Sequence, residues 1–144
     1  MAAERRAEVT WRGSLTDGEG TVEHVSTGLL DGLNVSWPAR TEDDQRGETS
    51  PEELIAAAHA SCFNMALSGA LGKAGTPPEE LRTSATVTFV PGTGITRSVL
   101  TVEGRVPGMD QNAFREAAEG AKDNCPVSKA LAGNVEMSVS ARLA

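Results

Sequence analysis

The chain contains two cysteines, and these are its residues best suited to covalent chemistry. Cys62 lies in the alanine-rich run AAAHASCFNMAL, and Cys125 directly precedes Pro126. A proline at that position favours the first turn of a helix, whose free N–H groups and dipole lower the pKa of a neighbouring thiol. The two residues are therefore candidates for a redox pair. The alternative is a pair of inert cysteines that pack in the core as small apolar residues.

A charged pair is expected to accompany a reactive thiolate. Glu52 lies in the first turn of a predicted helix, where the dipole stabilises an acidic residue in any case. Its neighbour Glu53 accounts for the capping signal, which leaves Glu52 available to orient a cation. Arg40 is the preferred cation, and Arg46 and Arg12 are the alternatives. Solvated surface charges remain the competing interpretation for all of these side chains.

His59 precedes Cys62 by three residues, so the two side chains share a helix face. This spacing is compatible with a Cys–His pair for acyl transfer, or with a metal site that also uses Cys125 and His24. No third orienting group is placed by spacing, and no pair of zinc ligands such as C-x2-C is present. A histidine that packs inside the fold is favoured.

Composition restricts the class of protein. The 144 residues carry a formal charge of -7 and a pI near 4.8, which argues against binding to nucleic acid or to an anionic membrane surface. No apolar run follows the basic N-terminal residues, which predicts a cytoplasmic protein without a signal peptide. Leu54 to Leu71 is alanine-rich but contains polar residues, which favours a helix inside the protein over a membrane span. A single domain over residues 1–144 is predicted.

The elements that position these residues follow from turn and cap signals. Short strands are predicted over 7–11, 21–27 and 33–37, with an Asp31-Gly32 turn. Ser50 and Pro51 begin a long helix that runs to about Lys73 and should be largely enclosed. Half-buried antiparallel strands are expected over 83–90 and 96–106, a helix from Asp110 to about Lys122, a helical turn near Pro126 and a last strand over 135–143. This order predicts an α+β fold.

Two strings make the chain similar to a known family. SPEELIAAAHASCF over 50–63 and NCPVSKAL over 124–131 resemble the OsmC/Ohr family of osmotically induced proteins and organic hydroperoxide resistance proteins. The strings WRG at 11–13, GTV at 20–22 and VPG at 106–108 also fit, so the resemblance covers nearly the whole chain. Ile55, His59 and Val127 resemble the OsmC branch more than the Ohr branch.

The resemblance implies a fold, a site and partners. The implied fold has antiparallel sheets around a long central helix in an intertwined homodimer. The implied site has Cys62 as the peroxidatic cysteine, Cys125 as the resolving cysteine and a catalytic pair of Arg40 and Glu52, with no metal or organic cofactor. The implied partners are an organic hydroperoxide and an external dithiol reductant. Glu52 and Cys62 are ten residues apart, roughly 15 Å along a helix, which favours a site shared between two subunits.

The expected activity is thiol-dependent reduction of organic hydroperoxides to alcohols, in oxidative or osmotic stress defence. One rival is a non-enzymatic module that binds small hydrophobic or acyl ligands in an apolar cavity. A second rival is a hydrolase that uses Cys62 and His59. Some of the apolar neighbours of the nucleophile are expected to line a substrate cavity, and the candidates are Phe63, Met65, Leu67 and Leu71, with Leu131 as an addition to the wall.

Overall fold

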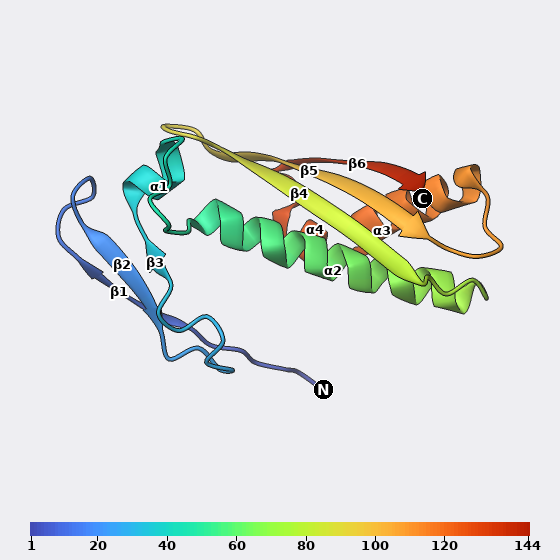
Figure 1. Cartoon of the computed structure of the whole chain (residues 1–144), viewed down its shortest axis with the longest axis horizontal. Helices are drawn as coiled ribbons and strands as arrows, with labels where there is room; N and C mark the ends of the chain where they lie inside the picture. Colours follow the sequence, from blue (N-terminus) through green and yellow to red (C-terminus); the bar gives the residue numbers. More distant parts are fainter. The chain divides into compact units, whose positions relative to one another are not determined.

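The computed structural model describes residues 1–144, which divide into two compact units, Met1–Leu54 and Ile55–Ala144. The predicted α+β class is confirmed, since the chain forms two three-stranded sheets and one long helix (Figure 1). That helix, α2 (Pro51–Lys73), begins in the first unit and continues through the second. Whether residues 1–144 act as a single domain stays a prediction.

The first unit contains a short antiparallel sheet in the order β1-β2-β3. Its strands are β1 (Glu8–Arg12), β2 (Glu19–Glu23) and β3 (Asn34–Val35). The second predicted strand stops early, because His24 adopts a left-handed backbone with φ of 52° that a strand does not accommodate. The sequence also missed α1 (Trp37–Thr41), which Ser36 caps by accepting a hydrogen bond from the Ala39 N–H.

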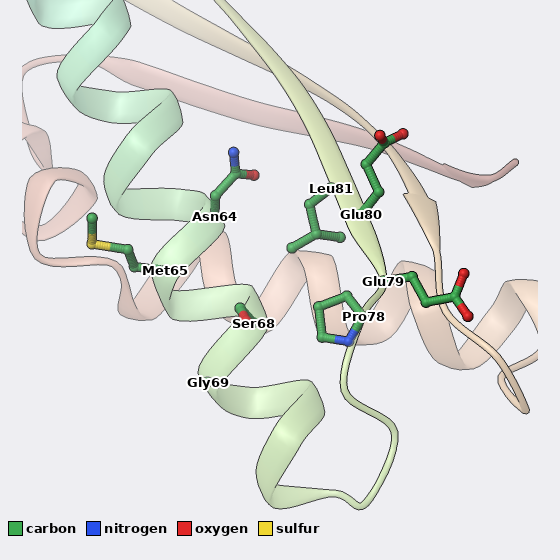
Figure 2. A pocket seen from close by; sticks show the side chains of 8 residues that line it. All are labelled: Asn64, Met65, Ser68, Gly69, Pro78, Glu79, Glu80 and Leu81. Atoms are coloured by element: carbon green, nitrogen blue, oxygen red, sulfur yellow. The ribbon is translucent and has the colours of Figure 1, made fainter.

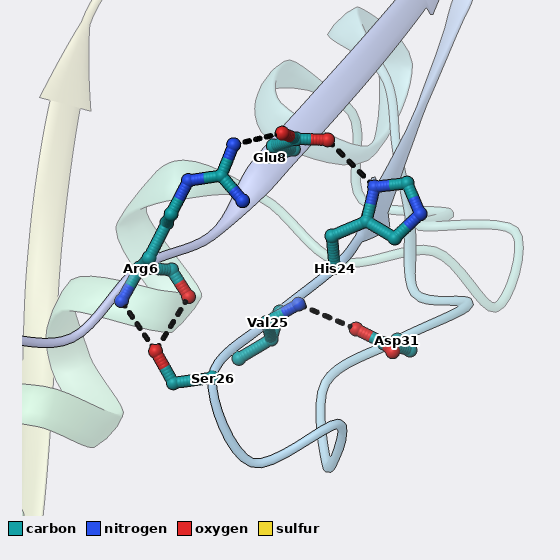
Figure 3. Close-up of polar contacts among 6 residues, drawn as sticks. All are labelled: Arg6, Glu8, His24, Val25, Ser26 and Asp31. Atoms are coloured by element: carbon teal, nitrogen blue, oxygen red, sulfur yellow. Dashed lines mark hydrogen bonds and ion pairs between the residues drawn. The ribbon is translucent and has the colours of Figure 1, made fainter.

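Polar contacts tie the N-terminal segment to the end of β2 (Figure 3). The His24 ring lies 2.6 Å from a Glu8 carboxylate oxygen, and Arg6 forms an ion pair with the other oxygen of Glu8. The hydrogen bond with Glu8 raises the pKa of His24, and the same contact lowers the pKa of Glu8. Ser26 accepts a hydrogen bond from the Arg6 backbone N–H. The exposed His24 therefore pairs with Glu8 within the first unit.

The start and end of α2 follow the predicted signals with one difference. The Ser50 hydroxyl accepts a 3.1 Å hydrogen bond from the Glu53 N–H, as a capping residue does. The Glu53 carboxylate accepts a hydrogen bond from the Thr49 hydroxyl at 2.7 Å, so the predicted reciprocal capping box is only half formed. At the other end, Gly75 adopts a φ of 86°, which terminates the helix in the left-handed conformation that glycine favours.

The second unit contains a mixed sheet in the order β4-β5-β6. Its elements are β4 (Glu80–Val90), β5 (Gly94–Arg105), α3 (Gln111–Asn124), α4 (Pro126–Leu131) and β6 (Glu136–Leu143). Strands β4 and β5 are antiparallel, whereas β6 runs parallel to β5. The prediction of antiparallel sheets is therefore wrong for β6. The helices α3 and α4 cross over between β5 and β6, and such a crossover lets the chain re-enter the sheet in the same direction.

One face of α2 supplies the core of the second unit. Phe63, Leu67 and Leu71 recur at intervals of four residues and are buried, so they occupy one side of the helix. They belong to one buried cluster together with residues of β5 and α3, namely Leu100, Val102, Phe114, Ala118 and Ala121. These three side chains therefore belong to the core, and of the four candidates on α2 for a substrate cavity only Met65 lies outside it.

The opposite face of α2 is exposed in the single chain. Met65 is 75% exposed, and small residues around it, including Ser61, Ser68 and Gly69, are exposed as well. The prediction that α2 is largely enclosed therefore holds in the single chain for one face of the helix only. The helix is long and apolar enough to span a membrane, a criterion that core helices of soluble proteins also meet. Its buried Phe63 and Leu67 identify it as a core helix.

Candidate active site

The two cysteines lie together within the second unit. Both are free thiols, and their side chains interact with each other although they are far apart in the sequence. Cys62 lies on α2 and is partly exposed, whereas Cys125 is completely buried at the junction of α3 and α4. A thiol that solvent reaches beside one that it does not reach is an arrangement suited to attack by the first and disulfide closure by the second.

Local structure explains the position of Cys125. Its N–H donates to the Ala121 carbonyl at 2.9 Å as the last bond of α3, and its carbonyl accepts from the Lys129 N–H at 3.0 Å as the first bond of α4. Pro126 follows as the first residue of α4, where its missing N–H costs nothing. The prediction of a helix start directly after Cys125 is confirmed.

The pKa values of the two thiols are shifted in opposite directions. Burial is the largest influence on Cys62 and raises its pKa. The Val127 N–H lowers the pKa by less than burial raises it, and the hydrogen bond and charge of Cys125 add smaller upward shifts, so the net pKa is raised. Burial also raises the pKa of Cys125, but the Ser128 N–H, the Cys62 thiol and the Ser128 hydroxyl together outweigh it, and the net pKa is lowered. These hydrogen bonds lower the pKa because they stabilise the thiolate more than the thiol. No side-chain hydrogen bond caps α4 at Cys125. The second unit by itself favours the charge on Cys125.

Arg40 and Glu52 form an ion pair in the first unit. The Arg40 Nε donates to Glu52 Oε1 at 2.9 Å, and a terminal guanidinium nitrogen lies 2.8 Å from the same oxygen. The Glu52 side chain is only 8% exposed, so this pair is shielded from solvent. The Arg40 guanidinium also lies 5.8 Å from the centre of the Trp37 ring, within the range of a cation–π contact.

The alternative arginines lie elsewhere. Arg46 pairs with Glu42 on the surface at 3.2 Å, and Arg12 is exposed on β1. Arg40 also borders a hollow of about 100 Å³ in the first unit. The hollow is lined mainly by apolar side chains, namely Trp11, Leu15, Val35, Trp37 and Pro51. The structure thus pairs Glu52 with the preferred arginine, beside an apolar surface that the sequence did not reveal.

His59 is completely buried and uses both ring nitrogens. Nδ1 lies 2.7 Å from the Ser98 hydroxyl, and Nε2 lies 2.8 Å from the Ser128 hydroxyl. These contacts do not provide the Cys62–His59 pair of the hydrolase hypothesis. No group of three or more His, Cys, Asp or Glu side chains is arranged to hold a metal ion. Neither serine was singled out as a site residue from the sequence: Ser98 lies in no motif, and Ser128 was noted only as part of the NCPVSKAL string.

Comparison with known proteins places the chain in a family. A family model described as OsmC-like protein matches residues 41–140, a region that contains Glu52, Cys62 and Cys125 and begins directly after Arg40. The chain belongs to the OsmC-like family. Among relatives of this family, the peroxiredoxin OsmC of Escherichia coli (strain K12) is 37% identical over 95% of this chain and 96% of its own length.

The same comparison favours one branch of the OsmC-like family. The organic hydroperoxide resistance protein of Xanthomonas axonopodis pv. citri (strain 306) is 33% identical over 97% of this chain and 99% of its own length. The crystal structure of the organic hydroperoxide resistance protein OhrB of Bacillus subtilis superposes with a TM-score of 0.68 at 28% identity, covering 95% of this chain and 98% of that chain. The higher identity to peroxiredoxin OsmC favours the OsmC branch, as the sequence predicted.

Proposed function

We propose that this protein is a thiol-dependent peroxidase that reduces organic hydroperoxides to alcohols, with Cys62 as the nucleophile and Cys125 as its disulfide partner. The observation that carries the proposal is the contact between two free thiols, one partly exposed and one buried. Relatives named peroxiredoxin OsmC and organic hydroperoxide resistance protein support this reaction class.

The reaction follows from the chemistry of the two sulfurs. The Cys62 thiolate attacks the O–O bond, so that an S–O bond forms and the alkoxide leaves and takes up a proton as an alcohol. Cys62 is oxidised to the sulfenic acid while the hydroperoxide is reduced. The Cys125 sulfur then attacks Cys62, an S–S bond replaces the S–O bond, and water leaves. An external dithiol reduces the disulfide and restores both thiols. These steps require neither a metal nor an organic cofactor.

The pair of Arg40 and Glu52 is proposed to hold Cys62 as a thiolate. Burial and Cys125 raise the pKa of Cys62, so a cation is needed to bring the charge to that sulfur. Arg40 is suited to this role because Glu52 already fixes its guanidinium. Ten positions along a helix amount to roughly 15 Å, so we propose that the Arg40 and Glu52 of a second subunit approach Cys62.

A homodimer is proposed to bury the exposed face of α2. This face borders a hollow of about 590 Å³, in which Asn64 and Ser68 of α2 lie on the side of Pro78 and Leu81, while the Met65 side chain points away from them (Figure 2). Small residues permit close approach of another backbone, and Met65 supplies an adaptable apolar contact. A second copy of α2 packed here would cover apolar surface that the single chain leaves in water.

The hollow beside Arg40 supports a preference for organic substrates. Trp11, Leu15 and Trp37 provide apolar surface close to the guanidinium. Each methylene group that a substrate buries there contributes about 0.8 kcal/mol of binding, which hydrogen peroxide does not gain. Since the dithiol cycle depends on a reducing partner, we propose the cytoplasm as the compartment.

Thiol titration tests the proposed function. Reduced protein is mixed with one equivalent of cumene hydroperoxide, and free thiols and the alcohol product are measured. Loss of both thiols with stoichiometric formation of the alcohol is expected, with higher kcat/KM for cumene hydroperoxide than for hydrogen peroxide. Retention of both thiols would contradict the proposal and favour the ligand-binding module. The matched control is Cys62→Ser, which is expected to leave the hydroperoxide intact.

A further inference from the structure

A buried row of polar side chains leads from the sheet to the resolving cysteine. His59 of α2 lies between Ser98 of β5 and Ser128 of α4, with contacts of 2.7 and 2.8 Å to their hydroxyls. His59 and Ser98 are fully buried, and Ser128 is 1% exposed. Burial of three polar side chains is costly unless each is hydrogen-bonded, and here each has a partner.

The row continues to both sulfurs. A hydrogen bond with the Ser128 hydroxyl lowers the pKa of Cys125. The hydrogen bond and charge of Cys125 in turn raise the pKa of Cys62. Among the groups that chiefly set the pKa of Cys125, the titratable one is Cys62. His59 is therefore linked to Cys125 through one hydroxyl group, and it is not bonded to Cys62.

The direction of the hydrogen bonds depends on the tautomer of His59. Burial lowers the pKa of His59, so the ring is neutral and has one donor and one acceptor nitrogen. With the proton on Nε2, the ring donates to the Ser128 oxygen, and the Ser128 O–H is free to donate to Cys125. With the proton on Nδ1, the Ser128 O–H points back to the ring, and Cys125 loses that donor. Ser98 can complete the first case, in which its hydroxyl donates to Nδ1.

We propose that His59 is a positioning residue for disulfide formation, which as its Nε2–H tautomer holds the Ser128 hydroxyl directed at the Cys125 sulfur. The inference rests on the proposed function. In this step the Cys125 thiolate attacks the Cys62 sulfenic sulfur, an S–S bond forms, and the S–O bond breaks. Hydroxide leaves through the exposed side of Cys62 and takes a proton from solvent to become water. Cys125 is oxidised and the sulfenic sulfur is reduced.

The first experiment titrates Cys125 without any peroxide. In a Cys62→Ser background the Cys125 thiolate is followed by its ultraviolet absorbance, which is free of tyrosinate interference because the chain contains no tyrosine. Both His59→Leu and Ser128→Ala are expected to raise the titration midpoint. The double variant is expected to match Ser128→Ala alone, because His59 acts through Ser128. Additive shifts, or unchanged midpoints in both single variants, would overturn the proposal.

The second experiment separates the two steps of the reaction in the otherwise native chain. Stopped flow with mass analysis follows the sulfenic acid on Cys62 and then the disulfide after a pulse of cumene hydroperoxide. His59→Leu and Ser128→Ala are expected to slow disulfide formation about 10-fold or more, the effect of one hydrogen bond to a charged sulfur, while sulfenic acid formation on Cys62 is not slowed. Equal slowing of both steps, or of neither, would contradict the positioning role.

Two further variants guard against a folding artefact. His59→Gln retains a side-chain N–H donor and is expected to recover part of the rate of disulfide formation. His24→Gln, a change at the other histidine of the chain, is expected to leave it unchanged. If the wild-type protein consumed no hydroperoxide, the proposed function would fail, while the Cys125 titration would still decide the role of His59. A midpoint insensitive to Ser128→Ala in a folded protein would refute that role alone.

Discussion

The two cysteines differ in what can reach them, and that difference separates their proposed roles. A hydroperoxide in solvent can meet Cys62, which is partly exposed, but not Cys125, which is 0% exposed. The thiol with which the buried Cys125 interacts is that of Cys62. Burial also protects Cys125 from direct oxidation by the substrate, so oxidation should reach it through Cys62.

Cysteine substitution tests these roles. Cys62→Ser should abolish peroxidase activity, because serine forms no sulfenic acid. Cys125→Ser should still consume about one equivalent of hydroperoxide and then retain a sulfenic or sulfinic acid on Cys62. Mass spectrometry of the treated chains checks both outcomes. Turnover above roughly a tenth of the wild-type rate in Cys62→Ser would assign the attack to another group.

Arg40 should control the reactivity of Cys62. Removal of its charge in Arg40→Ala should slow sulfenic acid formation about 10-fold or more, the equivalent of about 1.4 kcal/mol of thiolate and transition-state stabilisation. Arg46→Ala is the control, because Arg46 pairs with Glu42 at the surface. Rapid-mixing kinetics with cumene hydroperoxide measure both variants. Greater sensitivity at Arg46 would show that the assignment of the cation is wrong.

Glu19 should make stability depend on pH. A hydrogen bond with Glu48 raises the pKa of Glu19, so the folded protein binds a proton more tightly than the unfolded chain does. Such a group stabilises the fold below its unfolded pKa, and this contribution is lost as pH rises through the folded pKa. Glu19→Gln should therefore raise the midpoint of thermal unfolding at pH 7 and lose that advantage near pH 4.

The control for this effect is Glu116→Gln, which removes an exposed carboxylate on α3. It should change the unfolding midpoint little at either pH. A gain at pH 7 that persisted unchanged at pH 4 would rule out the carboxyl–carboxylate contact as its cause.

Sequence reasoning identified the residues of the candidate site that carry local signals. Cys125 was recognised because a proline follows it, and Glu52 because it opens a capped helix. The pair of Arg40 and Glu52 was expected from the family resemblance, and the structure brings the two together. The partners of His59 were not predictable, since Ser98 and Ser128 lie 39 and 69 residues away. Hydrogen bonds over such separations leave no periodic pattern in a sequence.

At the scale of elements, the packing of α3 on the sheet depends on one glycine. A Cβ at Gly104 of β5 would lie 2.4 Å from the Phe114 ring and 3.2 Å from Leu81. Phe114 is completely buried in the core and has little freedom to move. The absence of a side chain at this strand position therefore sets how closely the helix approaches.

Gly104→Ala should destabilise the protein by about 1–3 kcal/mol, because an overpacked core displaces side chains. Gly120→Ala is the matched control, since nothing lies within 4 Å of the added Cβ on α3. It should be neutral or stabilising by up to about 1 kcal/mol, owing to the higher helix propensity of alanine. Denaturant unfolding compares the two. Equal stability of the two variants would show that α3 yields to the extra methyl group.

The elements themselves were predictable to different degrees. Both ends of α2 followed from Ser50, Pro51 and Gly75, which act through local backbone conformation. The five-residue α1 was missed because a helix that short has no periodicity to detect. The direction of β6 was also missed, because it depends on the path of the intervening helices and not on the residues of the strand itself.

At the scale of the whole molecule, the proposed homodimer should be obligate for activity. Light scattering should give a mass near twice the 15.0 kDa of the chain at micromolar concentration. Met65→Asp should dissociate the dimer and abolish peroxidase activity, because a charge on the apolar face of α2 cannot be buried without a partner. Asn112→Asp, which adds the same charge on the exposed face of α3, should leave the mass unchanged. A monomer mass for the wild type would contradict the shared site.

The apolar hollow beside Arg40 has an optical consequence. Both tryptophans of the chain, Trp11 and Trp37, lie in its wall, and the chain has no tyrosine. All strongly emitting aromatic groups are therefore concentrated around the guanidinium that is paired with Glu52. The intrinsic ultraviolet emission of the protein should respond to any molecule that enters this hollow and to any movement of Arg40 across the Trp37 ring. Occupancy at this position can thus be followed in real time, without a label and without consuming a thiol.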